Sequence, residues 1–432
     1  MSILTKWLNR IVITILPFFA GMATGSAQQV VRLNIQEVYR MAQDNYPLIK
    51  QRNLLTRTKE YTISNAAKGY IPVLNINGQA TYQSDVTSIP FTIPHLTIPS
   101  YSKDQYKLFG EVDQVIYDGG AIKNQKNTAE ANEVVQQQNL DVQLYALYDR
   151  LNQLFLGALL VNEQLKQNDL VRKDVLNGIE KQKALVDNGT AFKSSVDELQ
   201  AQLLTTEQSR VELYAVKRAY LNMLGYFINK MLDTNTILQK PDMPEFTDEV
   251  SRPEILFYDY QKRLFDLQDD MLKVQLRPKF NFFFQGGYAR PGLNMLSNQF
   301  EWYYIGGVKL NWSIGSWYTL RNQRNLLDIN RATLDINKET FIFNTRITQK
   351  QQNSDIQKYN DLIAKDDDII KLRESVKAAS SAQLSNGVLS AHDYLTQVNK
   401  ADEARQNKIL HEIQLLQAAF NYQNTSGNIK LK

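Results

Sequence analysis

Residue types that carry catalysis are scarce in this chain and are not spaced for it. The sequence has 3 His and no Cys, which excludes disulfides, thiolate metal sites and cysteine nucleophiles. His411-Glu412 is followed by Ile413, Gln414 and Leu415, so the second histidine of a zinc-protease helix is absent. Neither a phosphate-binding Gly-Lys-Ser/Thr loop nor a nucleophile elbow occurs. The sequence therefore predicts no catalytic residue, no metal site and no cofactor.

Acidic residues form the other chemical feature. Asp366-Asp367-Asp368 is a run of three carboxylates, and Glu374 follows it on the same expected helix. We expect the run to be a solvated helix face, with attraction of cations by Asp367 and Glu374 as the alternative. His392 is expected to be solvated or to cap a helix rather than to bind a metal.

Composition and charge exclude further classes of protein. The chain has 432 residues, of which 43% are apolar, with 49 Lys+Arg against 45 Asp+Glu. A net charge of +4 is small for this length, so nothing favours nucleic acid as a partner. The mean hydropathy of -0.39 is too polar for a bundle of membrane-spanning helices. Any membrane crossing would have to use strands with alternating faces.

The N-terminus has the pattern of a cleaved secretory signal over residues 1–27. Lys6 and Arg10 precede an apolar stretch over 11–22, and small residues lead to an expected cut after Ala27. A retained anchor helix is the alternative, but the stretch is shorter than the roughly 20 residues a spanning helix needs and contains Pro17. The chain is therefore expected to leave the cytoplasm without a cysteine-linked lipid.

The landmarks of the first half recur in the second half. Three pairs of identical residues are all 206 positions apart: Pro47 and Pro253, Pro72 and Pro278, Tyr82 and Tyr288. This duplication predicts a first repeat over 28–235, a linker over 236–250 and a second repeat over 251–432. After an opening helix, the first repeat is expected to have strands 72–84 and 104–118 and helices 120–188 and 191–235. The second is expected to have strands 278–289 and 301–314 and helices 318–386 and 390–423.

Each predicted strand has an apolar and a polar face. Leu74, Ile76 and Tyr82 alternate with Asn75, Asn77 and Gln79, and the other three segments follow the same period. Phe109 and Phe283 are exceptions on the polar side. Period two over about 9–11 residues is typical of a tilted strand that crosses a bilayer, although a soluble sheet with one buried face gives the same pattern.

Aromatic residues at the strand ends favour the membrane interpretation. They include Tyr82, Tyr288, Trp302, Tyr304, Trp312 and Trp317. Such rings prefer the boundary between lipid and water. The proline-rich loop over 85–103 between the first two strands is expected to be an extended surface connector, with ligand binding as the alternative.

The proline-free stretch 120–188 predicts a helix of up to roughly 100 Å. Its apolar residues have the 4-3 spacing of a coiled coil: Leu140, Leu144, Leu147, Leu151, Leu154, Ala158, Val161 and Leu165. A second stripe that includes Tyr145, Phe155 and Leu159 predicts neighbours on both sides, as in a cylinder of helices. The core of an up-down bundle is the alternative.

Both long helices are expected to end in tight helical hairpins. The first hairpin contains Gly189, Ser195 and Asp197, and the second contains Gly387, Ser390 and Asp393. Glycine after the last turn permits a left-handed C-cap, and Ser or Asp accepts hydrogen bonds from the free N–H groups of the next helix. We expect these residues primarily to form structural turns.

Together these features resemble the TolC-type outer-membrane efflux proteins. The resemblance rests on the signal, the duplication, the Asn45-x-Pro47 start, the strand ending Tyr117-Asp118-Gly119-Gly120, and the hairpin Gly387-x-x-Ser390-x-x-Asp393. It spans nearly all of the mature chain. The second repeat departs from the first with Ile314-Gly315-Ser316 in place of Asp118-Gly119-Gly120. The absence of Cys places the chain with the non-acylated members.

The resemblance implies a mainly α fold with membrane β structure. Four strands per chain cannot close a barrel, and open sheet edges in lipid leave backbone groups unpaired. Strands from two or three copies of the chain could close a barrel together. The resemblance implies three copies, a homotrimer. Its β-barrel would continue into a long coiled-coil α-helical barrel across the periplasm.

The same resemblance implies a passive channel of a tripartite efflux or type I secretion system in the Gram-negative outer membrane. An inner-membrane transporter and a periplasmic adaptor (a membrane fusion protein) would be its partners, and outer-membrane lipid would surround it. The adaptor would contact the tips at Gly189, Ser195, Asp197, Gly387, Ser390 and Asp393. Asp367 and Glu374 would be candidates for a tunnel constriction. A secreted coiled-coil structural or adhesive protein without a pore is the alternative, and an outer-membrane enzyme is a further one.

Overall fold

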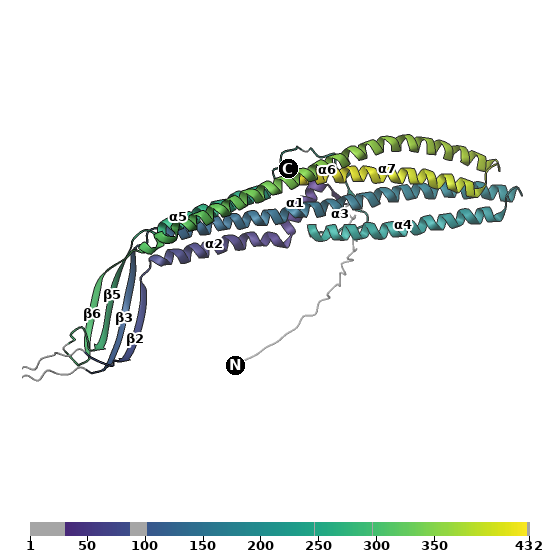
Figure 1. Ribbon diagram of the computed structural model, residues 1–432. Coiled ribbons are helices and arrows are strands. Elements are labelled where there is room, and N and C mark those ends of the chain that lie inside the picture. Colours follow the sequence, from purple (N-terminus) through teal and green to yellow (C-terminus); the bar gives the residue numbers. More distant parts are fainter. Residues whose placement is uncertain (1–30, 87–101, 246, 296, 430–432) are drawn as a thin grey trace, which may run out of the picture.

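The molecule is long, with a β-sheet at one end and paired helices extending away from it (Figure 1). The computed structural model describes residues 31–86, 102–245, 247–295 and 297–429. The expected signal over 1–27 and most of the proline-rich loop lie outside the described residues.

The chain is mainly helical. The first half contains β1 (Arg32–Leu33), α1 (Ile35–Asn45), η1 (Pro47–Lys50), α2 (Gln51–Ala67), η2 (Lys68–Tyr70), β2 (Val73–Tyr82), β3 (Asp104–Tyr117), α3 (Ala121–Asp187) and α4 (Lys193–Ile228). The second half contains β4 (Ile237–Leu238), α5 (Pro253–Gln275), β5 (Lys279–Arg290), β6 (Glu301–Asn311), η3 (Ile314–Ser316), α6 (Trp317–Ser385) and α7 (Ala391–Ser426).

Two long helices run the length of the helical part, each beside two shorter ones. α2 and then α4 lie along α3, while α5 and then α7 lie along α6 (Figure 1). All eight residues of the predicted seam of α3, from Leu140 to Leu165, are buried within the chain. Phe155 and Leu159 of the second stripe are buried as well. Neighbours inside one chain therefore cover both apolar stripes of α3.

The sheet is antiparallel, in the order β2-β3-β5-β6, and its edges are β2 and β6. Each strand is joined to a helix, and the helices next to the sheet follow the same lateral order, α2-α3-α5-α6. The strand register carries the predicted apolar positions onto one face: Ile76 pairs with Gly110, and Gly110 in turn with Gly286. One continuous, curved layer therefore extends from the strands into the helices.

The two exceptions to the strand alternation have a packing role. Phe109 is opposite Gly287, and Phe283 is opposite Gly307. A Cβ at Gly287 would come 2.5 Å from the Cβ of Phe109. Gly287 thus leaves room for the backbone and Cβ of Phe109, and Gly307 leaves room for the Phe283 ring, so each exception is opposite a position without a side chain.

Asp118 holds the junction between β3 and α3. Its Oδ1 accepts a hydrogen bond from Gly120 N at 2.8 Å, and its Oδ2 accepts one from Ile122 N at 2.6 Å. Gly119 and Gly120 have positive φ angles of 74° and 95°, which favour glycine. The corresponding junction of the second half is the 3-10 turn η3, so the two halves use different local chemistry here.

Two features of the first half and the linker were not anticipated. α1 is a separate helix before Pro47, and Asn34 forms a capping box with Glu37 at its start. The expected linker over 236–250 contains β4, which pairs in parallel with β1. Two-residue strands leave no periodic signal in a sequence, because period two needs several residues to be seen.

Candidate functional site: the hairpin tips, the helix wall and the two-faced sheet

The tips of both hairpins have the same backbone turn. After α3, Gly189 N donates to Val186 O at 2.9 Å and Thr190 N donates to Leu185 O at 2.8 Å. After α6, Gly387 N and Val388 N make the equivalent bonds at 3.1 and 3.0 Å. Both glycines have positive φ, 74° and 70°. Each tip is therefore a Schellman C-cap, as the glycines predicted.

The helices that follow the two turns start differently. Ser390 caps α7: its Oγ accepts a hydrogen bond from Asp393 N at 3.1 Å and donates one to Asp393 Oδ2 at 2.7 Å. The expectation of a similar Ser or Asp cap on α4 is wrong, because its N-cap is Phe192, which makes no side-chain capping bond. Ser195 lies inside the first turn of α4 instead, and Asp197 follows in the second turn, where it is exposed.

One histidine connects the two hairpins. His392 Nδ1 of α7 lies 3.0 Å from Glu198 Oε1 of α4, and the histidine side chain is 75% exposed. The sequence placed His392 in a solvated or capping position, and it is solvated. Its carboxylate partner belongs to the other hairpin, so the two tips are held side by side.

Behind the tips, ion pairs join three helices. Lys377 Nζ of α6 lies 2.8 Å from Asp174 Oδ2 of α3 and 3.0 Å from Glu374 Oε2. Glu374 also pairs with Arg405 of α7. Lys377, Asp174 and Arg405 were missed by sequence reasoning, because their partners are far apart in the chain and no local pattern joins them.

A cavity lies beside this network. Its volume is ≈ 520 Å³, and its lining includes Asp174, Lys181, Lys377, Ser381 and Tyr394. Tyr394 donates to the carbonyl of Asp174 at 3.0 Å, and burial raises the pKa of its hydroxyl to about 12. The tyrosine therefore remains a neutral hydrogen-bond donor throughout the physiological pH range.

Asp402 on α7 is a half-buried carboxylate near the same network. Burial raises the pKa of Asp402, although the hydrogen bond from Gln167 of α3 opposes this shift. The Gln167 Nε2 to Asp402 Oδ1 distance is 2.9 Å. α3 and α7 are thus joined by a polar contact whose charge depends on pH.

The acidic run does not form one solvated face. Asp366 is buried and faces His411 of α7, which corrects the expectation for this residue. Asp367 is exposed and pairs with Lys408 at 2.5 Å. Helix α7 packs along α6 at this level. The carboxylate of Asp366 therefore faces α7, whereas that of its neighbour Asp367 lies at the solvent-exposed side. A constriction role for Asp367 or Glu374 stays a prediction.

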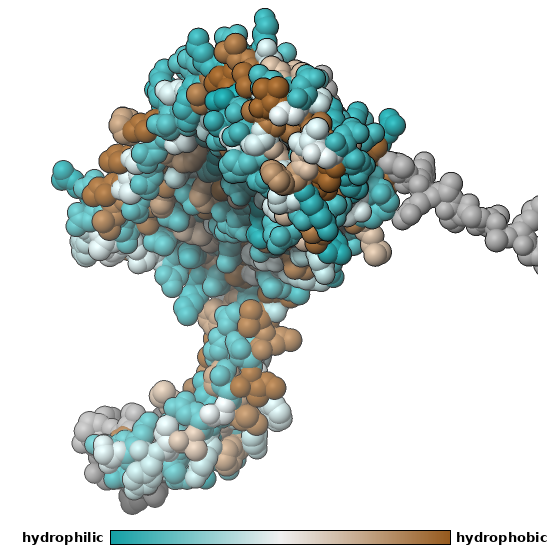
Figure 2. All heavy atoms as spheres, turned by 90° about the vertical axis from the view of Figure 1, so that its right-hand side faces the viewer, coloured by the Kyte–Doolittle hydropathy of each residue, from teal (hydrophilic) through white to brown (hydrophobic). Residues whose placement is uncertain are grey.

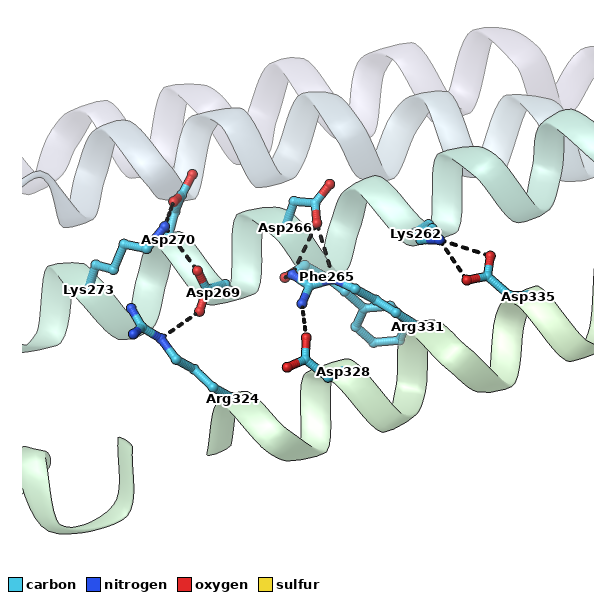
Figure 3. Close-up of polar contacts among 10 residues, drawn as sticks. All are labelled: Lys262, Phe265, Asp266, Asp269, Asp270, Lys273, Arg324, Asp328, Arg331 and Asp335. Carbon is cyan, nitrogen blue, oxygen red and sulfur yellow. Dashed lines mark hydrogen bonds and ion pairs between the residues drawn. The ribbon is translucent and has the colours of Figure 1, made fainter. Parts of the chain in front are cut away.

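Helices α5 and α6 are joined by a ladder of ion pairs (Figure 3). The pairs in antiparallel register are Asp259 with Lys338, Lys262 with Asp335, Asp266 with Arg331, and Asp269 with Arg324. Their N to O distances lie between 2.7 and 3.0 Å. On α5 these residues have 3-4-3 spacing, the one sequence signal that could have revealed this contact.

One face of the sheet exposes large apolar side chains. Ile76 is 86% exposed and Trp302 is 83% exposed. The same face carries Leu74, Tyr82, Leu108, Tyr304, Val308 and Leu310, all exposed. Contiguous apolar surface of this kind on a folded chain marks a contact with lipid or with protein.

A second apolar surface lies along α6, where the part of the chain that the structure describes leaves it exposed. Ile329, Ile336 and Phe343 are exposed and are seven residues apart. Leu326 and Ile347 extend this row, which we call the α6 stripe. Its spacing is that of a coiled-coil seam, so the α6 stripe is suited to packing against another helix.

The helical end of the molecule is hollowed. Figure 2, viewed toward the hairpin tips, shows that mainly hydrophilic residues line the hollow. Among the helices that the structure describes, none is both long enough and apolar enough to traverse a bilayer.

Solved outer-membrane proteins share this architecture at low sequence identity. CusC, a protein that forms a transmembrane channel, aligns with a TM-score of 0.65 and 11% identity over 90% of this chain and 91% of its own. The outer membrane protein VceC of Vibrio cholerae gives 0.63 and 10%, over 91% and 96% of the two chains. The CmeC outer membrane channel of Campylobacter jejuni gives 0.63 and 12%, over 91% and 85%. No protein-family model and no curated protein matches the sequence.

These similarities extend over the sheet and the helical hairpins alike, since each alignment covers at least nine-tenths of this chain. The chain therefore has the fold of the TolC-type outer-membrane channels.

Proposed function

We propose that three copies of this chain form a passive duct through the outer membrane of a Gram-negative bacterium. Solutes would arrive from an inner-membrane transporter through a periplasmic adaptor, as part of an efflux or type I secretion system. The transporter would supply the energy, and the duct would do no covalent chemistry.

The observation that carries this proposal is the open sheet with one apolar face. β2 and β6 are its edges, and the side chains on that face are large and exposed. An open edge in lipid costs several kcal/mol for each unpaired backbone group. If β6 of one copy pairs with β2 of the next, twelve strands close a barrel that is wide enough for water.

The order of the helices is consistent with the same ring of three copies. Since α2 and α6 end the lateral order of helices just as β2 and β6 end the order of strands, α6 of one copy would meet α2 of the next. The α6 stripe would then be covered, together with Leu54 and Tyr61, two exposed apolar residues of α2 that are seven positions apart. The hydrophilic hollow in Figure 2 would become the inner wall of a periplasmic tunnel.

The two halves, 28–235 and 251–432, would be structural repeats, and the two hairpins would be their tips. The tips at Gly189, Ser195, Asp197, Gly387, Ser390 and Asp393 lie at the end farthest from the sheet (Figure 1). A periplasmic adaptor would reach the duct there. Phe192 and Val388 are exposed at the same two turns and would offer apolar contacts.

Fractionation followed by electrical recording tests the proposal. The full chain should separate with outer membranes, require detergent for extraction and have the mass of a trimer. In a planar lipid bilayer the trimer should conduct ions. A monomer that dissolves without detergent would favour the secreted coiled-coil alternative and would contradict the proposed duct.

A further inference from the structure

The four connections between the sheet and the helices all lie at one end of the sheet (Figure 1). With the residues beside them, they are segments 68–72, 118–123, 276–279 and 309–321. The single acidic residue of these segments is Asp118, which is buried and caps α3. Their six basic residues are all exposed: Lys68, Lys123, Arg277, Lys279, Lys309 and Arg321. This end of the sheet is therefore strongly positive in a chain whose net charge is only +4.

The basic residues at the connections are not neutralised by carboxylates. None of the six forms an ion pair with another residue that the structure describes. One turn further along α6, in contrast, Arg324 pairs with Asp269. Arg277 donates a hydrogen bond to the carbonyl of Gly119 at 3.0 Å, which leaves its charge in place. The positive charge at this end can therefore attract an external anion.

The opposite end of the sheet is balanced in charge. Residues 82–107 and 288–303 contain three basic and three acidic residues, namely Lys103, Lys107, Arg290, Asp85, Asp104 and Glu301. Arg290 and Asp104 form an ion pair with each other. Exposed aromatic residues occur at both ends, with Tyr82 at one and Tyr318 at the other. Aromatic residues thus mark two boundaries, and charge distinguishes them.

Two of the six basic residues lie beside exposed aromatic residues. On α6, Arg321 follows Trp317 by four residues and Tyr318 by three, so these side chains share one face of the helix. In η2, Lys68 is two residues before Tyr70. All three aromatic side chains are exposed. Each group combines a ring that prefers the boundary between lipid and water with a cation that can bind a phosphate.

Two other basic residues belong to the polar face of the sheet. Lys279 is opposite Asn311, and Lys309 is opposite Asn281. The proposed duct turns this face toward water, so Lys279 and Lys309 are not assigned to lipid.

The proposed barrel would bring the two aromatic and basic groups together. β6 ends, and β2 begins, at the end of the sheet that meets the helices. If β6 of one copy pairs with β2 of the next, the start of α6 lies beside η2 of that next copy. Leu310 and Trp312, both exposed, continue the apolar face of the sheet up to this point.

We propose that anionic phospholipids bind at this boundary, with a headgroup phosphate between Arg321 of one copy and Lys68 of the next. This inference rests on the proposed function and names the lipid that the duct selects in the leaflet nearer the helices. The acyl chains would lie on the apolar face beside Leu310 and Trp312, so the site is continuous with the lipid contact of the sheet. Each basic residue near the membrane surface raises the affinity for an anionic lipid about fivefold.

Fluorescence quenching tests the site, because Trp312 and Trp317 lie beside it. The full-length protein is reconstituted in phosphatidylcholine vesicles that contain brominated phosphatidylglycerol or, at the same mole fraction, brominated phosphatidylcholine. Quenching gives the relative affinity of the two lipids, and the wild type should prefer phosphatidylglycerol at least about tenfold in dilute buffer. The preference should disappear in about 1 M salt, where charges are screened over about 3 Å.

Matched variants locate the preference on the protein. Lys68→Gln combined with Arg321→Gln should abolish it. Lys183→Gln combined with Lys193→Gln removes the same charge from two exposed residues near the first hairpin tip and should retain it. If the first double variant does not assemble, Lys68→Gln alone should reduce the preference about fivefold and decides the matter.

Three results would overturn the lipid site: equal quenching of the wild type by both lipids, a preference that persists without Lys68 and Arg321, or an equal loss in the tip variant. In each of these the protein is in the membrane, so the duct itself is not contradicted. A wild type that does not insert into vesicles would contradict the duct and the lipid site together.

Discussion

Lys377 Nζ lies 2.8 Å from Asp174 Oδ2, and this pair joins the two long helices just behind the hairpin tips. The lysine side chain is largely buried and also forms an ion pair with Glu374. Since Glu374 reaches Arg405 on α7, one lysine connects α3, α6 and α7. The spacing of the tips therefore depends on a small number of side chains.

Removing this cation should loosen the tips. Lys377→Met leaves Asp174 unpaired and should lower the free energy of unfolding by about 2 kcal/mol, the usual range for a hydrogen bond to a charged group. Limited proteolysis should cut faster near residues 188–192 and 386–390. Lys183→Met, on an exposed residue of α3 near the first tip, is the control. Cleavage rates that match between the two variants would show that the pair does not restrain the tips.

The positive φ of Gly387 gives a local test of the second tip. Gly387→Val should destabilise the turn by about 1–2 kcal/mol, because a β-branched residue is strained in this region. Gly387→Asn should cost less, since asparagine tolerates it. No heavy atom lies within 4 Å of a Cβ built there, so the difference reports backbone strain alone. The rate of hydrogen exchange of the tip amides should rise in Gly387→Val only, and the yield of trimer should be unchanged in both variants. If either variant fails to form trimers, the tip has a role in assembly instead.

The pKa of Asp402 predicts a pH-dependent stability with a definite sign. Burial raises this pKa in the folded protein, so the folded chain binds the proton more tightly than the unfolded chain. The stabilisation is complete below the unfolded pKa and is lost as the pH rises through the folded value. Asp402→Asn should therefore raise the unfolding midpoint at about pH 7.5 and leave it unchanged near pH 3.5. Glu403→Gln, its exposed neighbour, should show neither effect.

The ladder between α5 and α6 should respond to salt. A double-mutant cycle with Lys262→Met and Asp335→Asn should give a coupling of about 0.3–1 kcal/mol in dilute buffer. The same cycle in about 1 M salt should approach zero, because screening acts over about 3 Å there. A coupling that persists at high salt would mean that packing of the lysine stem, rather than charge, joins the helices.

Assembly should depend on the α6 stripe. Ile336→Lys places a charge in the middle of the row that we expect to meet the next copy, and it should reduce the yield of trimer at least tenfold, measured by light scattering in detergent. Asn337→Lys adds the same charge at the next exposed position and should assemble normally. If both variants form trimers equally well, the stripe faces solvent or another partner.

Much of the local structure could be predicted because its causes are local. Alternation with period two predicted the apolar and polar faces of the strands, and the register confirms that the apolar positions share one face. Gly189 and Gly387 predicted the C-caps, since a left-handed turn excludes most other residues. The same reasoning failed at α4, where a serine near the helix start does not reveal whether it is the cap or lies one turn inside.

The sequence by itself determined where the two long helices α3 and α6 end in a turn and which residues of each strand share a face, because backbone sterics and side-chain period act over a few residues. Only the tertiary structure decided that helices of the same chain cover both stripes of α3 while the described residues leave the α6 stripe exposed, that Asp366 is buried opposite His411, and that Lys377 reaches Asp174. Those contacts join residues 45 to 203 positions apart, and their partners are chosen by the antiparallel register of whole helices, which no short window of sequence contains.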